Sequence, residues 1–221
     1  RILLESRPLQ QVPDELRGAA LLGVVRRKGL GILPWSRNLA QWRARVCLMH
    51  EVSASGKDNP WPDLSDDALL QGLEHWLGPW LSDVRRLQDF HGLDLKGILA
   101  AQLPWPLPLE LERLAPERLP VPSGSSIAID YSQDPPVLAV KLQEMFGCEE
   151  TPRIADGSVP LLVHLLSPAG RPLQMTQDLA GFWRSGYQEV RKEMRGRYPK
   201  HPWPEDPTVA DPTLRVKPRG A

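Results

Sequence analysis

The residues best suited to chemistry are cations that recur along the segment 177–207, QDLAGFWRSGYQEVRKEMRGRYPKHPWPEDP. Lysine and arginine bind phosphate oxygens, so a row of them on one helix face is typical of a nucleic-acid backbone contact. The cations of this segment are Arg184, Arg191, Lys192, Arg195, Arg197 and Lys200, with Glu189 and Glu193 as counter-charges. The alternative is a solvated basic face on a terminal helix that packs against its own domain.

A helix must bring these cations to one face, and the apolar residues of the same segment predict it. Leu179, Phe182, Trp183, Tyr187, Val190 and Met194 follow the 3.6-residue period of a helix. Thr176 with Asp178 can start that helix, and Pro199 ends it near Tyr198 because the residue before a proline avoids helical geometry. We expect Trp183 to be buried against the strand predicted at 159–166.

A stiff tail follows the predicted helix. Its prolines, Pro199, Pro202, Pro204 and Pro207, each remove a backbone donor and fix a φ angle. Trp203 lies among them and has two open roles, a fixed dock on a protein surface or stacking on a base. The flanking prolines favour docking, which also raises a second hypothesis: a protein–protein interaction module that binds through this proline- and tryptophan-rich tail.

Composition describes an ordinary soluble protein and excludes a global electrostatic attraction to nucleic acid or membrane. The formal net charge is +0, with 41% hydrophobic and 24% charged residues. No run of 18 apolar residues occurs, so no membrane partner is expected. Cys47 and Cys148 lie beside apolar residues and indicate reduced core thiols in a cytoplasmic protein. The chain begins with Arg1 inside an apolar run, which suggests a piece of a longer polypeptide.

No catalytic, metal-binding or cofactor-binding residue is predicted. Gly56-Lys57 lacks the preceding glycine and the following hydroxyl of a Walker A loop. The histidines are scattered, without the spacing of a metal site. The loop Ser123-Gly124-Ser125-Ser126 offers backbone donors that can cradle a phosphate, but a plain hairpin turn is the favoured interpretation.

The first half of the chain reads as helical, over residues 13–103. One helix follows Pro13-Asp14 and ends at Gly29, and a second begins at Ser36 or Asn38, with Arg43 and Arg45 expected to point outward. Ser65-Asp66-Asp67 caps a third helix, which Gly78-Pro79 ends. A further helix is predicted from about Ser82 to Leu103, with a break near Gly92. The prolines of 104–108, PWPLP, predict an extended connector.

The second half, 104–221, contains short alternating or apolar runs typical of strands. Strands are predicted at 119–122, 126–131, 159–166 and 172–175, and VLAVKLQEMFG at 137–147 is either a strand or a strand that runs into a short helix. The predicted fold class is therefore α+β. A helical N-terminal half precedes a small β-sheet, which the long basic amphipathic helix and the Pro/Trp-rich tail close.

Three separated runs resemble the C-terminal domain of the HrpB-type bacterial ATP-dependent helicases. They are PVLAVKLQEMFG, VPLLVHLLSPAGRPLQMTQDLAGFW and EVRKEMRGRYPKHPWPEDP, and the strongest part is RYPKHPWPEDP at 197–207. The upstream runs GLGILPWSRNLAQWRARV and WPDLSDDALLQGLEHWLGPWL are similar to the segment that precedes this domain in the family. The resemblance covers nearly the whole chain.

The resemblance implies a parent polypeptide of the DEAH-like RNA helicase group, with ATP and Mg²⁺ bound in its core. It implies that residues 1–12 end a preceding OB-like domain and that 104–221 form the family-specific C-terminal domain. The family's ATP-site motifs have no counterpart in this sequence, so no catalytic residue is carried over and no cofactor is expected in this fragment. The implied partners are the helicase core of the same polypeptide and single-stranded RNA.

Overall fold

A computed structural model describes residues 13–54 and 58–215 of the chain. The chain divides into two compact units, Arg1–Leu107 and Pro108–Ala221. The expected end of an OB-like domain at residues 1–12 lies outside the described residues.

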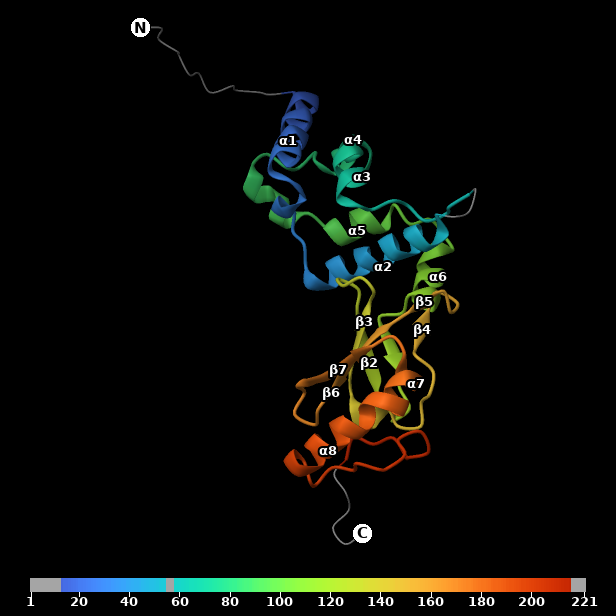
Figure 1. The fold of residues 1–221 in the computed structure, drawn as a ribbon. Helices are drawn as coiled ribbons and strands as arrows, with labels where there is room; N and C mark the ends of the chain where they lie inside the picture. The colour runs from blue at the N-terminus through green and yellow to red at the C-terminus, as the bar shows by residue number, and fades with distance from the viewer. Residues whose placement is uncertain (1–12, 55–57, 216–221) are drawn as a thin grey trace. The chain divides into compact units, whose positions relative to one another are not determined.

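The first unit is built from helices, as the sequence predicts (Figure 1). Ser36 begins the second helix, because its side chain accepts a hydrogen bond from the Leu39 N–H. Gly29 ends the first with a φ of 81°, a backbone conformation that favours glycine. The elements are α1 (Asp14–Lys28), η1 (Leu30–Ile32), α2 (Arg37–Ser53), α3 (Asp66–Gln71), α4 (Leu73–Trp76), η2 (Gly78–Trp80), η3 (Leu87–Gly92) and α5 (Leu95–Ala100).

The break expected near Gly92 is confirmed, but the helix expected to begin at about Ser82 is wrong, because residues 82–86 are not helical. The structure has the short turn η3 and the separate helix α5 in its place. Asp89 accepts hydrogen bonds from the Arg85 and Arg86 N–H groups at 2.9 Å, and Asp94 caps α5 by accepting from Gly97 N–H at 3.0 Å. Asp89 caps the start of η3 and Asp94 caps the start of α5, so each carboxylate favours the start of a separate element.

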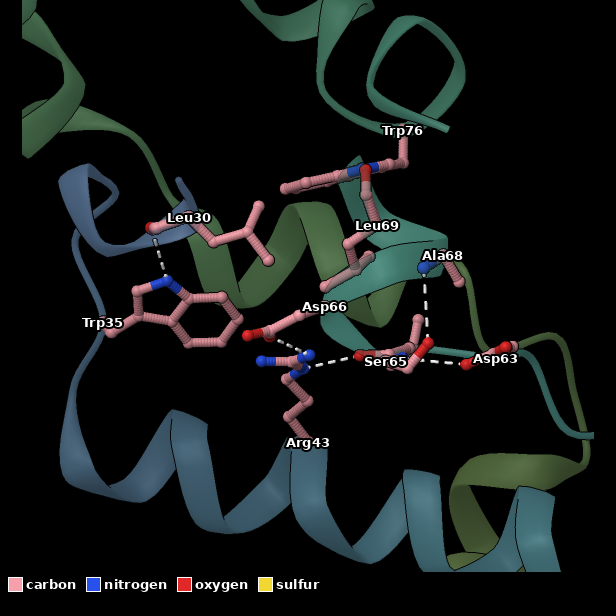
Figure 2. Close-up of polar contacts among 10 residues, drawn as sticks. Leu30, Trp35, Arg43, Asp63, Ser65, Asp66, Ala68, Leu69 and Trp76 are labelled. Carbon is pink, nitrogen blue, oxygen red and sulfur yellow. Dashed lines mark hydrogen bonds and ion pairs between the residues drawn. The ribbon is translucent and has the colours of Figure 1, made fainter. Parts of the chain in front are cut away.

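Arg43 and Arg45 of α2 do not point outward as expected. Arg45 is buried, with 1% of its surface exposed, and it has a polar partner. The Arg43 Nε donates to the Leu64 carbonyl and its Nη2 pairs with Asp66 Oδ1, both at 2.6 Å, while its guanidinium lies 5.2 Å from the centre of the Trp35 ring. Figure 2 shows these contacts, which fix the segment before α3 against α2.

The second unit contains a mixed sheet and the terminal helical segment (Figure 1). Its elements are α6 (Leu107–Leu114), β1 (Arg118–Pro120), β2 (Ser126–Asp130), β3 (Val137–Lys141), η4 (Leu142–Met145), β4 (Arg153–Ile154), β5 (Val159–Pro160), β6 (Leu162–Leu166), β7 (Pro172–Thr176), α7 (Leu179–Gly181), the π-helical turn η5 (Phe182–Gly186) and α8 (Tyr187–Arg197). The five-stranded sheet has the order β1-β2-β3-β6-β7, and β4 pairs with β5 in a separate ribbon.

The pairing of β3 with β6 is parallel, whereas the other neighbours in the sheet are antiparallel. Leu138 pairs with Val163 and both are 0% exposed, so these positions face the core. VLAVKLQEMFG is a strand followed by a short helical turn, which settles the alternative that the sequence left open. The α+β fold class is confirmed.

Two further expectations need correction. The strand predicted at 159–166 is two strands, because the Leu161 N–H donates to the Pro152 carbonyl at 2.9 Å and the chain then changes partners. The connector predicted at 104–108 is not extended throughout, because α6 begins at Leu107. Proline is tolerated in the first turn of a helix, where the missing donor has no helical partner, so Pro108 does not prevent α6 from forming.

The predicted terminal helix is formed by α7, η5 and α8, which follow one another without a gap. The π-helical turn η5 within it is not predicted by the 3.6-residue spacing of the apolar residues. The Tyr187 N–H bonds to the Phe182 carbonyl across this turn. Phe182, Trp183 and Tyr187 are all buried, and their rings lie 5.1–6.4 Å from one another. Phe146 lies 6.2 Å from the Trp183 ring, and the Trp183 Nε1 donates to the Cys148 carbonyl at 2.7 Å. Burial of Trp183 is therefore confirmed, within an aromatic cluster, while its packing against the strand at 159–166 stays a prediction.

Candidate nucleic-acid interface

The proline-rich tail is fastened to α8 by three side chains from its first turn and a half. The Tyr187 hydroxyl donates to the Pro204 carbonyl at 2.9 Å, and the Gln188 Nε2 donates to the Glu205 carbonyl at 2.8 Å. One turn later, the Arg191 Nε donates to the Trp203 carbonyl at 3.0 Å. Three consecutive tail carbonyls thus receive donors from one side of the helix.

The sequence of the tail explains why its carbonyl groups accept hydrogen bonds from α8 while, over the described residues, its own backbone donates none to that helix. Proline lacks an N–H, so a segment rich in proline offers the protein mainly carbonyl acceptors. Further along, the Gly147 N–H donates to the Pro207 carbonyl and the Thr213 N–H donates to the Gln143 carbonyl, both at 2.9 Å. The tail is therefore held between α8 and the segment that follows β3.

Trp203 is packed within its own unit, with 5% of its surface exposed. Its Nε1 donates to the Tyr198 carbonyl at 3.0 Å, and the His201 N–H donates to the same oxygen at 3.1 Å. The last carbonyls of a helix lack helical donors and need other partners. The indole therefore closes the C-terminal end of α8.

The predicted phosphate-binding cations fall into distinct groups. Arg191 is taken up by the tail, because its side chain is only 20% exposed and also lies 3.5 Å from Glu205. Arg197 forms a looser pair with Glu193 at 3.6 Å, with both side chains largely in solvent. Lys192, Arg195 and Lys200 are exposed, and the described residues supply no ion-pair or hydrogen-bond partner to their side chains. That these residues bind nucleic acid stays a prediction.

Arg184 lies apart from the cations at the end of α8. It lines an open groove of about 470 Å³ together with the carboxylates of Glu149, Glu205 and Asp206. Hydrogen bonds from Thr208 keep the pKa of Asp206 below its usual value. A groove with three carboxylates and one guanidinium is a poor place for a phosphate, because like charges repel.

Burial sets the ionisation of two rings in this region. Burial raises the pKa of Tyr187, whose hydroxyl donates to the Pro204 carbonyl. Burial, helped by the charge of Lys141, lowers the pKa of His201. The His201 ring lies edge-on to the Tyr198 ring with centres 6.3 Å apart.

Sequence reasoning missed Tyr187, Gln188 and the Tyr198 carbonyl as fastening groups. A signal existed, since 187, 188 and 191 lie on one side of a helix and the prolines predict a row of acceptors. The loop at Ser123 is a hairpin turn. Its Ser123 hydroxyl donates to Glu144 Oε1 at 2.9 Å, and that carboxylate disfavours a phosphate. Across the described ranges, no group of three or more His, Cys, Asp or Glu side chains is placed to hold a metal ion.

Comparison with known proteins shows the family to which this chain belongs. A family model for the C-terminal region of ATP-dependent helicases, HrpB_C, matches residues 76–207, which is more than half of the chain. The chain belongs to this helicase C-terminal family. The match begins in the helical unit and ends within the tail.

Relatives of the family match in sequence and in fold. The ATP-dependent RNA helicase HrpB of Escherichia coli K12 is 42% identical over 218 residues, covering 98% of this chain and 27% of the relative. A crystal structure of the E. coli DExH-box NTPase HrpB has a TM-score of 0.82 at 43% identity, over 95% of this chain and 26% of that one. A crystal structure of the E. coli DEAH/RHA helicase HrpB has a TM-score of 0.69 at 40% identity, over 90% and 25% of the two chains.

The chain thus spans about a quarter of the length of these relatives. The recognised resemblance to HrpB-type helicases is confirmed. In the described part of the chain, no helix has the length and apolar character needed to cross a membrane.

Proposed function

We propose that this chain is the non-catalytic C-terminal region of an ATP-dependent RNA helicase, where it braces the helicase core and adds contacts to RNA phosphates. ATP and Mg²⁺ belong, in this proposal, to the core of the parent polypeptide, which works in the cytoplasm. The family membership supports the first part, because the relatives carry this region as about a quarter of a longer helicase chain.

The observation that carries the RNA contact is the set of unpaired cations at the end of α8. Lys192, Arg195 and Lys200 are exposed, and the structure shows none of the described residues neutralising them. A cation held by a carboxylate must break that pair to bind phosphate, whereas these three need not. Each phosphate contact to a single strand steepens the log–log salt dependence of binding by about 0.7.

The alternative of a protein-interaction module that docks through Trp203 needs the tail to leave its place on α8. That release would expose an indole that is now 5% exposed and break the three carbonyl contacts from Tyr187, Gln188 and Arg191. Each net hydrogen bond contributes about 0.5–1.5 kcal/mol. The contacts within the unit favour a structural role for Trp203.

The test of the RNA contact is a double charge reversal, Lys192→Glu with Arg195→Glu, in the 221-residue chain. Binding of a fluorescent single-stranded RNA is measured by anisotropy at several salt concentrations. Loss of two contacts should weaken binding to all sequences alike and flatten the salt slope by about 1.4. Arg191 is left unchanged, because its reversal would also release the tail.

The matched control reverses the same charge on the other unit, as Arg27→Glu with Lys28→Glu, both exposed at the end of α1. If control and test weaken binding equally, only net charge matters and the interface is not at α8. If neither changes binding, the RNA contact is refuted. The bracing role is tested in the parent polypeptide by deleting residues 108–221, which should lower the melting temperature of the remaining core.

A further inference from the structure

The C-terminal end of α8 carries an aromatic residue, Tyr198, in addition to its cations. The sequence offers Trp203 as a base-stacking residue, but its indole is packed inside. Tyr198, the C-cap residue that follows α8, is instead half-buried. The aromatic residue Tyr198 therefore lies at the C-terminal end of α8, close in the chain to the exposed cations Arg195 and Lys200.

The backbone of Tyr198 is held from three directions. Its N–H donates to the Met194 carbonyl at 2.7 Å, and its carbonyl accepts from both the Trp203 Nε1 and the His201 N–H. On its ring side, the His201 ring packs edge-on with an interplanar angle of 84°. A ring fixed in this way loses little conformational entropy on binding, which is the advantage of a preorganised contact.

Several cations lie near Tyr198 along the chain, although one of them, Arg197, is paired with Glu193 at 3.6 Å. Arg195 precedes Tyr198 by three residues, Arg197 is its neighbour, and Lys200 follows within the turn that the His201 N–H closes. Lys141 at the end of β3 is close enough to act on His201. Cations that track a phosphate backbone beside an aromatic face are the two components of single-strand recognition.

We propose that Tyr198 stacks on a base of single-stranded RNA while Arg195 and Lys200 hold the flanking phosphates. This inference rests on the proposed RNA contact and extends it by naming the strand type. In a duplex the bases are already stacked on each other, so the ring has no free base to contact. Trp203 acts as a positioning residue, because its Nε1 holds the carbonyl of Tyr198.

The experiment compares Tyr198→Leu with Tyr198→Phe in the 221-residue chain. Both keep the backbone hydrogen bonds, but only phenylalanine keeps an aromatic face. The ligands are a single strand, a duplex of the same length and a ribose-phosphate strand without bases. Tyr198→Leu should weaken single-strand binding by about 5-fold or more. It should leave binding of the duplex and of the base-free strand unchanged, and Tyr198→Phe should bind like the original chain.

A second measurement reports on Trp203 and guards against misfolding. Trp203→Phe removes the indole donor, and the double variant with Tyr198→Leu should lose no more single-strand affinity than Tyr198→Leu alone. The unmodified chain should also bind the base-free strand more weakly than the single strand. This comparison requires no substituted protein. Equal binding of those two strands overturns the stacking role.

The two proposals fail in distinguishable ways. If Tyr198→Leu has no effect while the reversal of Lys192 and Arg195 still weakens binding, stacking is refuted and the phosphate contact stands. If the reversal also has no effect, the RNA contact itself is refuted. If Tyr198→Leu weakens single strand and duplex equally, the ring contributes to the shape of the surface and the stacking proposal is wrong.

Discussion

Truncation of Trp183 to alanine tests the packing of the whole second unit. The side chain is 4% exposed and touches rings from two segments, Phe146 after β3 and Tyr187 at the start of α8. If those contacts hold the terminal helix on the sheet, removing the indole should destabilise this unit and leave the other unit unaffected.

The magnitude follows from burial. A buried tryptophan removes about 150–250 Å² from water, and at about 25 cal/mol per Å² this amounts to about 4–6 kcal/mol. Alanine keeps the first carbon, so a loss of about 3–5 kcal/mol is expected, which agrees with typical large-to-small substitutions. Trp183→Phe should cost less than Trp183→Ala, because it keeps one aromatic ring and loses the donor to the Cys148 carbonyl together with part of the indole volume.

The assay is urea unfolding followed by circular dichroism, with the slope of free energy against urea checked for a change in the unfolded state. Met175→Ala is the control in the same unit, because Met175 is 58% exposed and its truncation should cost less than about 1 kcal/mol. A loss below about 1 kcal/mol for Trp183→Ala would refute the reasoning, because it would mean that the indole is not enclosed in solution.

Four further predictions follow from single contacts. Gly186→Ala should destabilise by about 1–3 kcal/mol in urea melts, because its new carbon would lie 2.8 Å from a Phe182 ring carbon, whereas Gly196→Ala in open space should not destabilise. Burial raises the pKa of Cys148, so iodoacetamide at pH 8 should alkylate the folded chain more slowly than the urea-unfolded chain; equal rates would contradict the burial. The pKa of His201 is lower folded than unfolded, so the unfolded state binds the extra proton and stability should fall as pH drops through about 6.5; His201→Gln should flatten that dependence in thermal melts. The purified chain should not hydrolyse ATP, and hydrolysis that disappears on mutating a residue of the chain would exclude the helicase-appendage proposal.

Local chemistry made much of the fold predictable from sequence alone. Ser36 begins α2 and Gly29 ends α1 because capping depends on one side chain or one backbone angle. The strand β2 and its hairpin turn follow from alternation and a short polar loop. The burial of Trp183 follows from a period that is set by helix geometry.

Other features depended on contacts between residues far apart in sequence. Arg45 looks like a solvent-facing cation, yet it is buried, because what surrounds a helix face is decided by packing. The strand at 159–166 divides at Leu161 because a distant carbonyl, that of Pro152, takes its N–H. No local pattern reports such a competition for one donor.

The same division holds for the candidate interface. Sequence alone determined which cations exist, that a helix carries them and that a rigid tail follows. Only the tertiary structure decided which of these cations have a partner within the protein. Arg191 donates to the carbonyl of Trp203, 12 residues further along the chain, while the neighbouring Lys192 has no such contact among the described residues. Helix periodicity fixes the direction of a side chain, but its partner depends on where the rest of the chain packs. The packing of this tail buries Trp203 and leaves Tyr198 half-buried.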